Sequence, residues 1–365
     1  MMGVRCPGLE RSLFTLMLSI VIVLSKVVYL TNELAFEKRD SRIHGLQISP
    51  ALTICESLWI LIRRSNNLRV EARMFDRIVE LFCDFDDFCA RVMPEWEAML
   101  LTDGEKPDRK HGPECGLVDS EIMTILVIYH ASRYKNFKTF YNGVVRTLLR
   151  SHFPGAPCYE RFLTLTKRVW PLLVFFLASR MGRKTHIYYI DSTPLPVCHN
   201  KRIPKHKVFS GWAARGKTSM GWFFGFKLHL VFNHEREIVA VKLTPGNVSD
   251  TTPVPDLTKE LVGKLFGDKG YIGQKLGQDL LRRGLALMTR VRKNMKSLPV
   301  SFLDKALLNG RNIAETIIGH IKEFSSLRLP KHRSVFNAFT HITAAIIAYQ
   351  LNPLPPKPIR VSLPD

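Results

Sequence analysis

The spacing of apolar residues changes near residue 186, from a helical repeat to an alternating one. Before this point, apolar residues recur three or four positions apart in the stretches 75–101, 137–151 and 158–180, and in one that starts at Asp119. This spacing predicts amphipathic helices, with Asp119 and Ser120 as a candidate cap. After this point, residues 222–232 alternate apolar with polar side chains, as half-buried strands do.

Five strands are predicted in the second half, at 187–197, 222–232, 238–243, 265–268 and 285–292. The first three are predicted to form an antiparallel meander. Helices are predicted at 253–264, at 274–283 and around Glu315, and an apolar stripe from Phe336 to Tyr349 predicts a core helix. Three strands, a helix, then strand, helix, strand and helix are typical of a layered α/β domain.

The chain is strongly basic, with 53 Lys and Arg against 32 Asp and Glu, a net charge of +21 and a pI of about 9.8. This balance favours a polyanionic partner, either nucleic acid or an anionic membrane surface, over a merely solvated basic surface. The seven cysteines are scattered without a Cys-x-x-Cys pair, which argues against a disulfide framework and a zinc ribbon. A reducing, cytoplasmic location fits this usage best.

Residues 1–73 differ from the rest. Their apolar segment 13–30 is interrupted at Lys26 and is short for a spanning helix, so a membrane protein is the less favoured interpretation. The preferred one is an atypical extension from a misassigned start, with Met74 as the working start. The other predicted domains are a helical, DNA-binding domain at 74–182, a catalytic domain at 183–352 and a Pro-rich tail at 353–365. For the helical domain, basic outer faces suggest helix-turn-helix-like DNA contacts, and a plain support domain is the alternative.

Three carboxylates in the second half are candidate catalytic groups. Asp191 and Asp268 each follow an apolar run that predicts a buried strand, and Glu315 lies in a predicted helix. Two strand-end aspartates and a helical glutamate can converge on a pair of Mg²⁺ ions, which prefer oxygen ligands and activate phosphodiester cleavage. Taken singly, each carboxylate is more simply a turn, a cap or a surface charge.

Basic residues near these carboxylates are candidate phosphate contacts. Arg311, Glu315, Gly319 and Lys322 share one face of the predicted helix, so Arg311 and Lys322 can meet phosphates beside Glu315. A second basic cluster is predicted to contact the DNA backbone through Lys201, Arg202, Lys205 and Lys207.

Two further polar residues are given structural roles. Asp250 is more simply a helix cap than a fourth carboxylate of the site, and His229 is expected to pack in the core.

Five motifs resemble the DDE transposases of bacterial insertion sequences, in particular an insertion-sequence 982-like group. They are Tyr189 to Pro194, Gly225 to His229, Thr244 to Asp250, Leu265 to Tyr271 and Arg311 to Lys322. In the last motif, the family often shows a tyrosine three residues before the arginine, and this chain has Leu308 there.

The resemblance implies a ribonuclease-H-like catalytic domain, a mixed five-stranded sheet with flanking helices, preceded by an all-helical domain. It implies that Asp191, Asp268 and Glu315 hold two Mg²⁺ or Mn²⁺ ions, and that Arg311 and Lys322 hold phosphates. The activity implied is cleavage at transposon ends and transfer of the 3′-OH into target DNA. The implied partner is DNA, in the cytoplasm at the nucleoid, with a homo-oligomer to join two ends and no small-molecule cofactor. The alternative is an inactive or domesticated remnant that only binds DNA.

Overall fold

A computed structural model of the chain describes residues 78–102, 116–132, 134–219, 221–290, 301–324, 327, 332–352 and 354. These residues divide into two compact units. The first holds α4 (Ile78–Thr102), the start of α5 (Asp119–Ala131) and α8 (Trp170–Ser179). The second holds the other elements, including the whole sheet. Residues 1–73, with the apolar segment 13–30, and nearly all of the tail 353–365 lie outside the described residues.

The first unit is held together by aromatic packing and by polar contacts at the start of α5. Phe85 and Phe88 of α4 pack on Phe176 of α8, with ring centroids 4.5 and 5.3 Å apart. Asp119 and Ser120 do not cap α5 as predicted. Asp119 pairs with Arg168 at 2.6 Å, Ser120 donates to Asp86, and the N–H of Val118 is accepted by Glu121 instead.

Two predicted helical stretches differ from a single regular α-helix. The stretch 137–151 forms α6 (Phe137–Phe140), which continues as a π-helix, η2 (Tyr141–Leu148). The stretch 158–180 is not one helix, because α7 (Tyr159–Leu165) ends and α8 starts only at Trp170. Pro171 explains the break, since proline lacks the N–H and clashes with a preceding helical turn, and is tolerated only in the first turn.

The sheet has six strands rather than the five predicted. They are β1 (Ile187–Cys198), β2 (Ala214–Thr218), β3 (Gly221–Asn233), β4 (Ile238–Pro245), β5 (Gly263–Gly267) and β6 (Leu285–Thr289). The order is β2-β3-β1-β5-β6. Strand β4 also pairs with β3, along the part of β3 that follows its pairing with β2. Strands β1, β3 and β4 form the predicted antiparallel meander, whereas β5 and β6 are parallel to β1. This mixed sheet with flanking helices is compatible with a ribonuclease-H-like fold.

Two segments of this unit depart from the sequence prediction for local reasons. Strand β2 lacks an apolar alternation, and it is a strand because it pairs with β3 along its whole length. Helix α9 (Val254–Leu257) is much shorter than the predicted 253–264. The chain turns into β5 at Gly263, whose φ of 113° is a backbone conformation that favours glycine.

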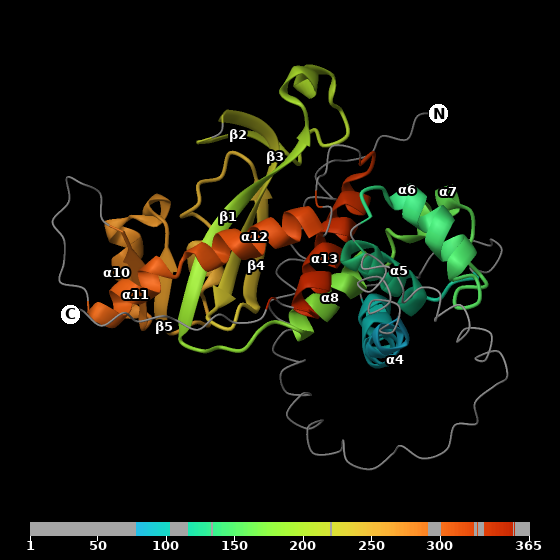
Figure 1. Cartoon of the computed structure of the whole chain (residues 1–365), viewed down its shortest axis with the longest axis horizontal. Helices are drawn as coiled ribbons and strands as arrows, with labels where there is room; N and C mark the ends of the chain where they lie inside the picture. The colour runs from blue at the N-terminus through green and yellow to red at the C-terminus, as the bar shows by residue number, and fades with distance from the viewer. Residues whose placement is uncertain are drawn as a thin grey trace, which may run out of the picture. The chain divides into compact units, whose positions relative to one another are not determined.

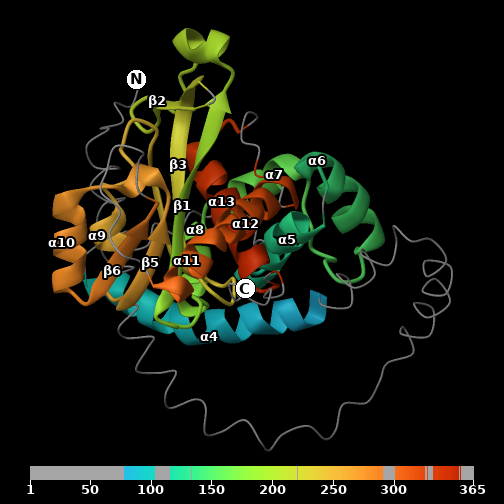
Figure 2. The same ribbon diagram turned by 60° about the vertical axis from the view of Figure 1, so that its left-hand side comes forward.

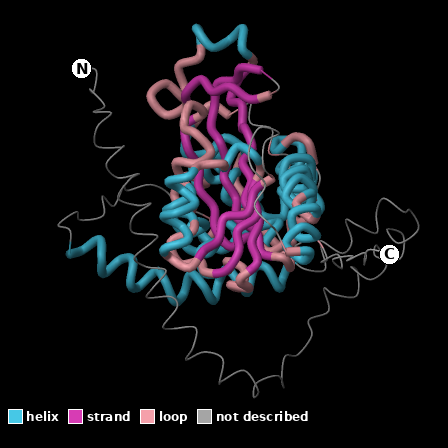
Figure 3. The backbone as a smooth tube through the Cα atoms, turned by 90° about the vertical axis from the view of Figure 1, so that its left-hand side faces the viewer, coloured by secondary structure: helices cyan, strands magenta, loops and turns pink. Residues whose placement is uncertain are grey.

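Helices cover both faces of the sheet, as Figures 2 and 3 show. Tyr188 and Ile190 of β1 lie in the core on the side of α9 and α10 (Gln274–Arg282). Tyr189 packs on the opposite side, against α11 (Phe302–Asn309) and the start of α12 (Asn312–Phe324). Side chains alternate along a strand, so Asp191 lies on the side of Tyr189 and α12. Helix α12 crosses β1 there (Figure 1), and α13 (Val335–Gln350) packs against α12.

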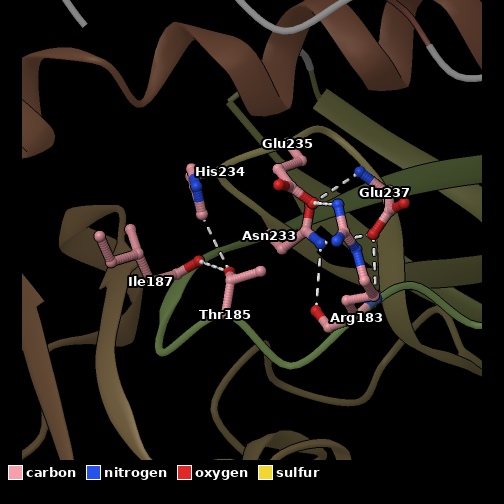
Figure 4. Close-up of polar contacts among 7 residues, drawn as sticks. All are labelled: Arg183, Thr185, Ile187, Asn233, His234, Glu235 and Glu237. Atoms are coloured by element: carbon pink, nitrogen blue, oxygen red, sulfur yellow. Dashed lines mark hydrogen bonds and ion pairs between the residues drawn. The ribbon is translucent and has the colours of Figure 1, made fainter.

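A polar network fixes the start of β1 to the β3–β4 turn (Figure 4). The amide of Asn233, which is fully buried, donates to the carbonyl of Arg183 at 3.1 Å and to Glu237 at 2.7 Å, and accepts the N–H of Glu237. Arg183 also pairs with Glu235 at 2.6 Å. The network sets where β1 begins beside β3, and therefore the level at which Asp191 lies.

No single helix in the described part of the chain is long and apolar enough to cross a membrane. Helices α7 and α8 meet those criteria only when they are taken together as a bent pair.

Candidate active site

Strand register brings Asp191 and Asp268 to the same level of the sheet. Strands β1 and β5 are parallel neighbours, and their last pair is Tyr189 with Phe266. Each aspartate follows its paired residue by two positions. Asp268 comes directly after β5, as predicted, whereas Asp191 lies inside β1, which continues to Cys198 along β3. The two carboxylates therefore lie where β1 leaves its parallel neighbour.

Arg311 links Asp268 to Glu315. One guanidinium nitrogen of Arg311 lies 2.8 Å from Oδ1 of Asp268, and the other lies 3.6 Å from Oε1 of Glu315. Arg311 comes just before α12 and Glu315 is in its first turn, so the arginine and the glutamate share one side of the helix. Lys322 lies seven residues beyond Glu315 on the same helix, near its end.

The electrostatics of Asp191 show that the three carboxylates are close enough to interact. The pKa of Asp191 is raised to about 6, chiefly by burial and also by the negative charges of Asp268 and Glu315. The backbone N–H of Ser192, 2.8 Å from Oδ1, and the Arg311 charge act in the opposite direction. We call Asp191, Asp268 and Glu315 the carboxylate cluster.

The carboxylate cluster supplies the type of ligand that a divalent ion needs, but it does not enclose one in this conformation. Among the described residues, no group of three His, Cys, Asp or Glu side chains is arranged to hold a metal. The guanidinium of Arg311 lies between Asp268 and Glu315 and provides positive charge there. Three carboxylates fit Mg²⁺ or Mn²⁺ by chemistry, because these hard ions take oxygen ligands and keep several waters. Binding would require Arg311 to move away from this position.

A second polar cluster lies on the other face of β1, directly behind the carboxylates. Lys227 of β3 is nearly buried, and its Nζ lies 3.1 Å from Oδ1 of Asp250 and donates to the carbonyl of Val248. Ser192 donates to the same Oδ1 of Asp250 at 2.8 Å. Asp250 thus forms an ion pair rather than the predicted helix cap, and α9 has no side-chain cap. The cluster ties the segment after β4 to β1 next to Asp191.

Tyr271 belongs to this region and was not singled out from the sequence. Its ring is buried in the core beside Ile190 and Val231. Burial raises the pKa of Tyr271, and the charges of Asp191, Asp250 and Asp268 raise it further. Its position three residues after Asp268 is the signal that could have identified it. His229, predicted to pack, is fully buried and bonded to Thr244.

The predicted DNA-contacting cations of the second cluster lie elsewhere. Lys201, Arg202 and Lys205 are exposed on the 3-10 turn η3 (Asn200–Lys205), and Lys207 is exposed just after it. This turn follows the end of β1 beyond the carboxylates and lies past the ends of the strands (Figure 3). Leu308, at the position where the resembling family often has tyrosine, is buried against the core cluster of Tyr189 and Phe266.

Part of the chain matches a known protein family. Residues 181–335 match the family described as Transposase DDE domain. The match supports a DDE transposase. It includes every member of the carboxylate cluster, the basic turn η3 and the hairpin of β2 and β3. No curated protein and no solved structure gave a match.

Proposed function

We propose that this chain is a DNA transposase that cleaves transposon ends and joins the freed 3′-OH to target DNA. The observation that carries the proposal is the level shared by Asp191 and Asp268 on parallel neighbours β1 and β5, with Glu315 linked to them through Arg311. The family match supports transposase activity in general. A ribonuclease-H-like fold and membership of an insertion-sequence 982-like group are parts of the proposal.

Asp191, Asp268 and Glu315 are proposed to hold two divalent ions, Mg²⁺ or Mn²⁺. Such ions supply an activated oxygen nucleophile and neutralise charge on the leaving oxygen. The raised pKa of Asp191, about 6, reflects a buried carboxylate beside two other carboxylates, an arrangement that added positive charge would relieve.

Arg311 is proposed to exchange its carboxylate partners for a phosphate of the DNA. Its guanidinium is only loosely placed against Glu315, at 3.6 Å, and its side chain remains partly accessible. Arginine binds phosphate oxygens through two parallel N–H donors, so the same side chain can neutralise the carboxylates without substrate and hold DNA with it. Lys322, further along α12, is proposed to hold a neighbouring phosphate.

Two other predictions from the sequence are also part of the proposal. DNA is the partner, which the net charge of +21 favours, and a homo-oligomer is expected because two transposon ends must be joined. The boundaries at 73/74, 182/183 and 352/353, nucleoid association and DNA binding by the helical region stay predictions.

Strand cleavage tests this function. The substrate is the DNA that flanks the reading frame, with Mg²⁺ and the full-length chain. We expect cleavage at a defined phosphate, and a loss of at least a hundredfold in Asp191→Asn, Asp268→Asn and Glu315→Gln, because each removes one proposed ligand. Asp279→Asn, which changes an exposed carboxylate of α10, is the matched control and keeps the activity.

Cleavage by the wild type without a divalent ion, or cleavage that survives any one of the three substitutions, contradicts the proposal. DNA binding without cleavage under all conditions supports the alternative of an inactive remnant.

A further inference from the structure

The segment between β1 and the middle of β3 carries positive charge without acidic residues. No Asp or Glu occurs from Ser192 to His234. In the same segment, six basic side chains are exposed: Lys201, Arg202, Lys205, Lys207, Arg215 and Lys217. Together with Trp222 they form a surface that we call the basic tip. A surface with one sign of charge attracts a polyanion rather than a mixed protein surface.

The hairpin of β2 and β3 presents this charge on one face only. Gly216 pairs with Phe223, and both are buried. The next pair, Lys217 with Trp222, points to the opposite face and is exposed. The alternation of side chains along a strand therefore places an aromatic ring among cations on the outer face.

Trp222 is unusual in its exposure. Its side chain is 61% exposed, and it is the only exposed aromatic residue among those whose burial the structure describes. The ammonium of Lys217 lies 5.7 Å from the centre of the indole ring. A largely exposed indole next to a cation is the combination that proteins use to stack on nucleic-acid bases and hold the phosphates beside them.

The base of the hairpin is closely packed, so the backbone around Trp222 is tied to its neighbours. A Cβ at Gly216 would collide with the carbonyl oxygen of Gly246, and one at Gly225 would collide with that of Leu195. These glycines let β2, β3 and β1 approach closely. The amide of Asn200 donates to the carbonyl of Trp222 at 2.7 Å and ties η3 to the same end of the hairpin.

The position of the ring along β3 relates it to the carboxylate cluster. Asp191 is paired with Leu230 of β3, and Trp222 lies eight residues before Leu230 on the same strand. At about 3.3 Å per residue, this separation is roughly 26 Å, less than one turn of B-form DNA. DNA held at the carboxylate cluster can therefore reach the basic tip.

Resting on the proposed function, we propose that the β2–β3 hairpin is a base-stacking arm for the DNA. Trp222 stacks on a base that is outside the duplex, because the bases of an intact duplex are already stacked on one another. Lys217 and Arg215 hold the phosphates on either side of that nucleotide, and the cations of η3 hold the adjoining duplex.

Binding of two DNA probes by the full-length chain tests the arm. One probe is a blunt 20-base-pair duplex, and the other is the same duplex with a six-nucleotide single-stranded tail. We expect tighter binding of the tailed probe by the wild type, and a loss of that preference of about tenfold in Trp222→Ala, the usual effect of removing one stacking aromatic. Trp222→Phe keeps most of the preference. The blunt duplex binds equally to all three proteins. Leu281→Ala, which truncates an exposed apolar residue of α10, is the control for surface truncation.

The result separates the arm from the catalytic proposal. If Trp222→Ala keeps the wild-type preference for the tail, the arm is wrong even when the protein cleaves DNA. If the preference for the tailed probe depends on Trp222 but no cleavage is found, the proposal of a base-stacking arm is supported and the catalytic proposal fails. If the wild type binds neither probe, both are overturned. Circular dichroism of Trp222→Ala, with Trp222→Phe as the second variant, excludes unfolding as the cause of a lost preference.

Discussion

The two ends of strand β3 use polar residues in opposite ways. At the Asn233 end, Arg183 pairs with Glu235 and its backbone N–H donates to Glu237. The buried amide of Asn233 donates to the carbonyl of Arg183 and to Glu237. At the Trp222 end, exposed cations lie in a segment without acidic residues, and the indole of Trp222, the one exposed Phe, Tyr or Trp among the described residues, lies among them. The polar groups at the first end are hydrogen-bonded within the fold, whereas the cations at the second end are exposed and, in our proposal, bind DNA. The carboxylate cluster lies alongside β3 between these two ends.

The largest effect on stability is expected at the Asn233 end. Asn233→Ala removes two donated bonds and one accepted bond at a fully buried position, so it should lower the free energy of unfolding by about 3 kcal/mol. Trp222→Ala, at the exposed end, should change it by less than about 0.5 kcal/mol. Urea denaturation measures both variants. Equal losses would show that the two ends do not differ in their structural role.

A smaller effect is expected with pH in the middle of β3. The pKa of His229 is lowered to about 4, chiefly by burial; Asp250 acts against this shift, and Lys227 and Lys242 add to it. The unfolded chain takes up the proton near pH 6.5 and the folded chain only near pH 4. Stability from this group is therefore present above pH 6.5 and is lost as the pH falls towards 4, on the order of 2–3 kcal/mol. The measurement is urea denaturation at several pH values between 4 and 7.

His229→Gln is the matched control for this acid sensitivity. Glutamine can keep the bond to Thr244, 2.8 Å away, but does not titrate. The variant should lose less stability than the wild type between pH 6.5 and 4. An identical pH dependence would mean that other groups cause the loss.

The smallest effect is expected from single cations of the tip. Lys201→Gln and Lys205→Gln should each leave stability unchanged and reduce the slope of log affinity against log salt by about 1 for duplex DNA. Lys259→Gln removes an exposed lysine beyond α9, outside the basic tip, and is the control. Fluorescence anisotropy at several salt concentrations measures these slopes. If the slopes of both variants equal the wild-type value, η3 does not contact the DNA.

The sequence predicted those parts of the fold that follow from local pattern. The alternating run before Asn233 and the apolar runs before Asp191 and Asp268 became β3, β1 and β5, since burial alone decides such strands. Strand β2 was missed because its residues have no strand pattern, and only pairing with β3 makes it extended. The break before Trp170 was also missed, because the apolar periodicity continues through Pro171, which a helix accommodates only in its first turn.

For the candidate site, the types of residue could be predicted from the sequence, but their partners could not. Asp191, Asp268, Glu315 and Arg311 were named from order and spacing, and the fold brings all four together. The partner of Asp250 could not be predicted, because Lys227 meets it only after β3 pairs with β1 and the segment after β4 folds back. Tyr271 was not predicted for the same reason, since its burial beside Ile190 depends on tertiary packing.

The central claim is that chemistry resides in the carboxylate cluster and that DNA holding resides at the basic tip. Single-turnover cleavage of end-containing DNA, with protein in excess over its dissociation constant, tests this claim most directly. Glu315→Gln should bind the DNA with wild-type affinity and cleave it at least a hundredfold more slowly. Combined Lys201→Gln and Lys205→Gln should bind more weakly and, once saturated, cleave at the wild-type rate. Wild-type cleavage by Glu315→Gln, or a slow saturated rate in the tip variant, would contradict the account.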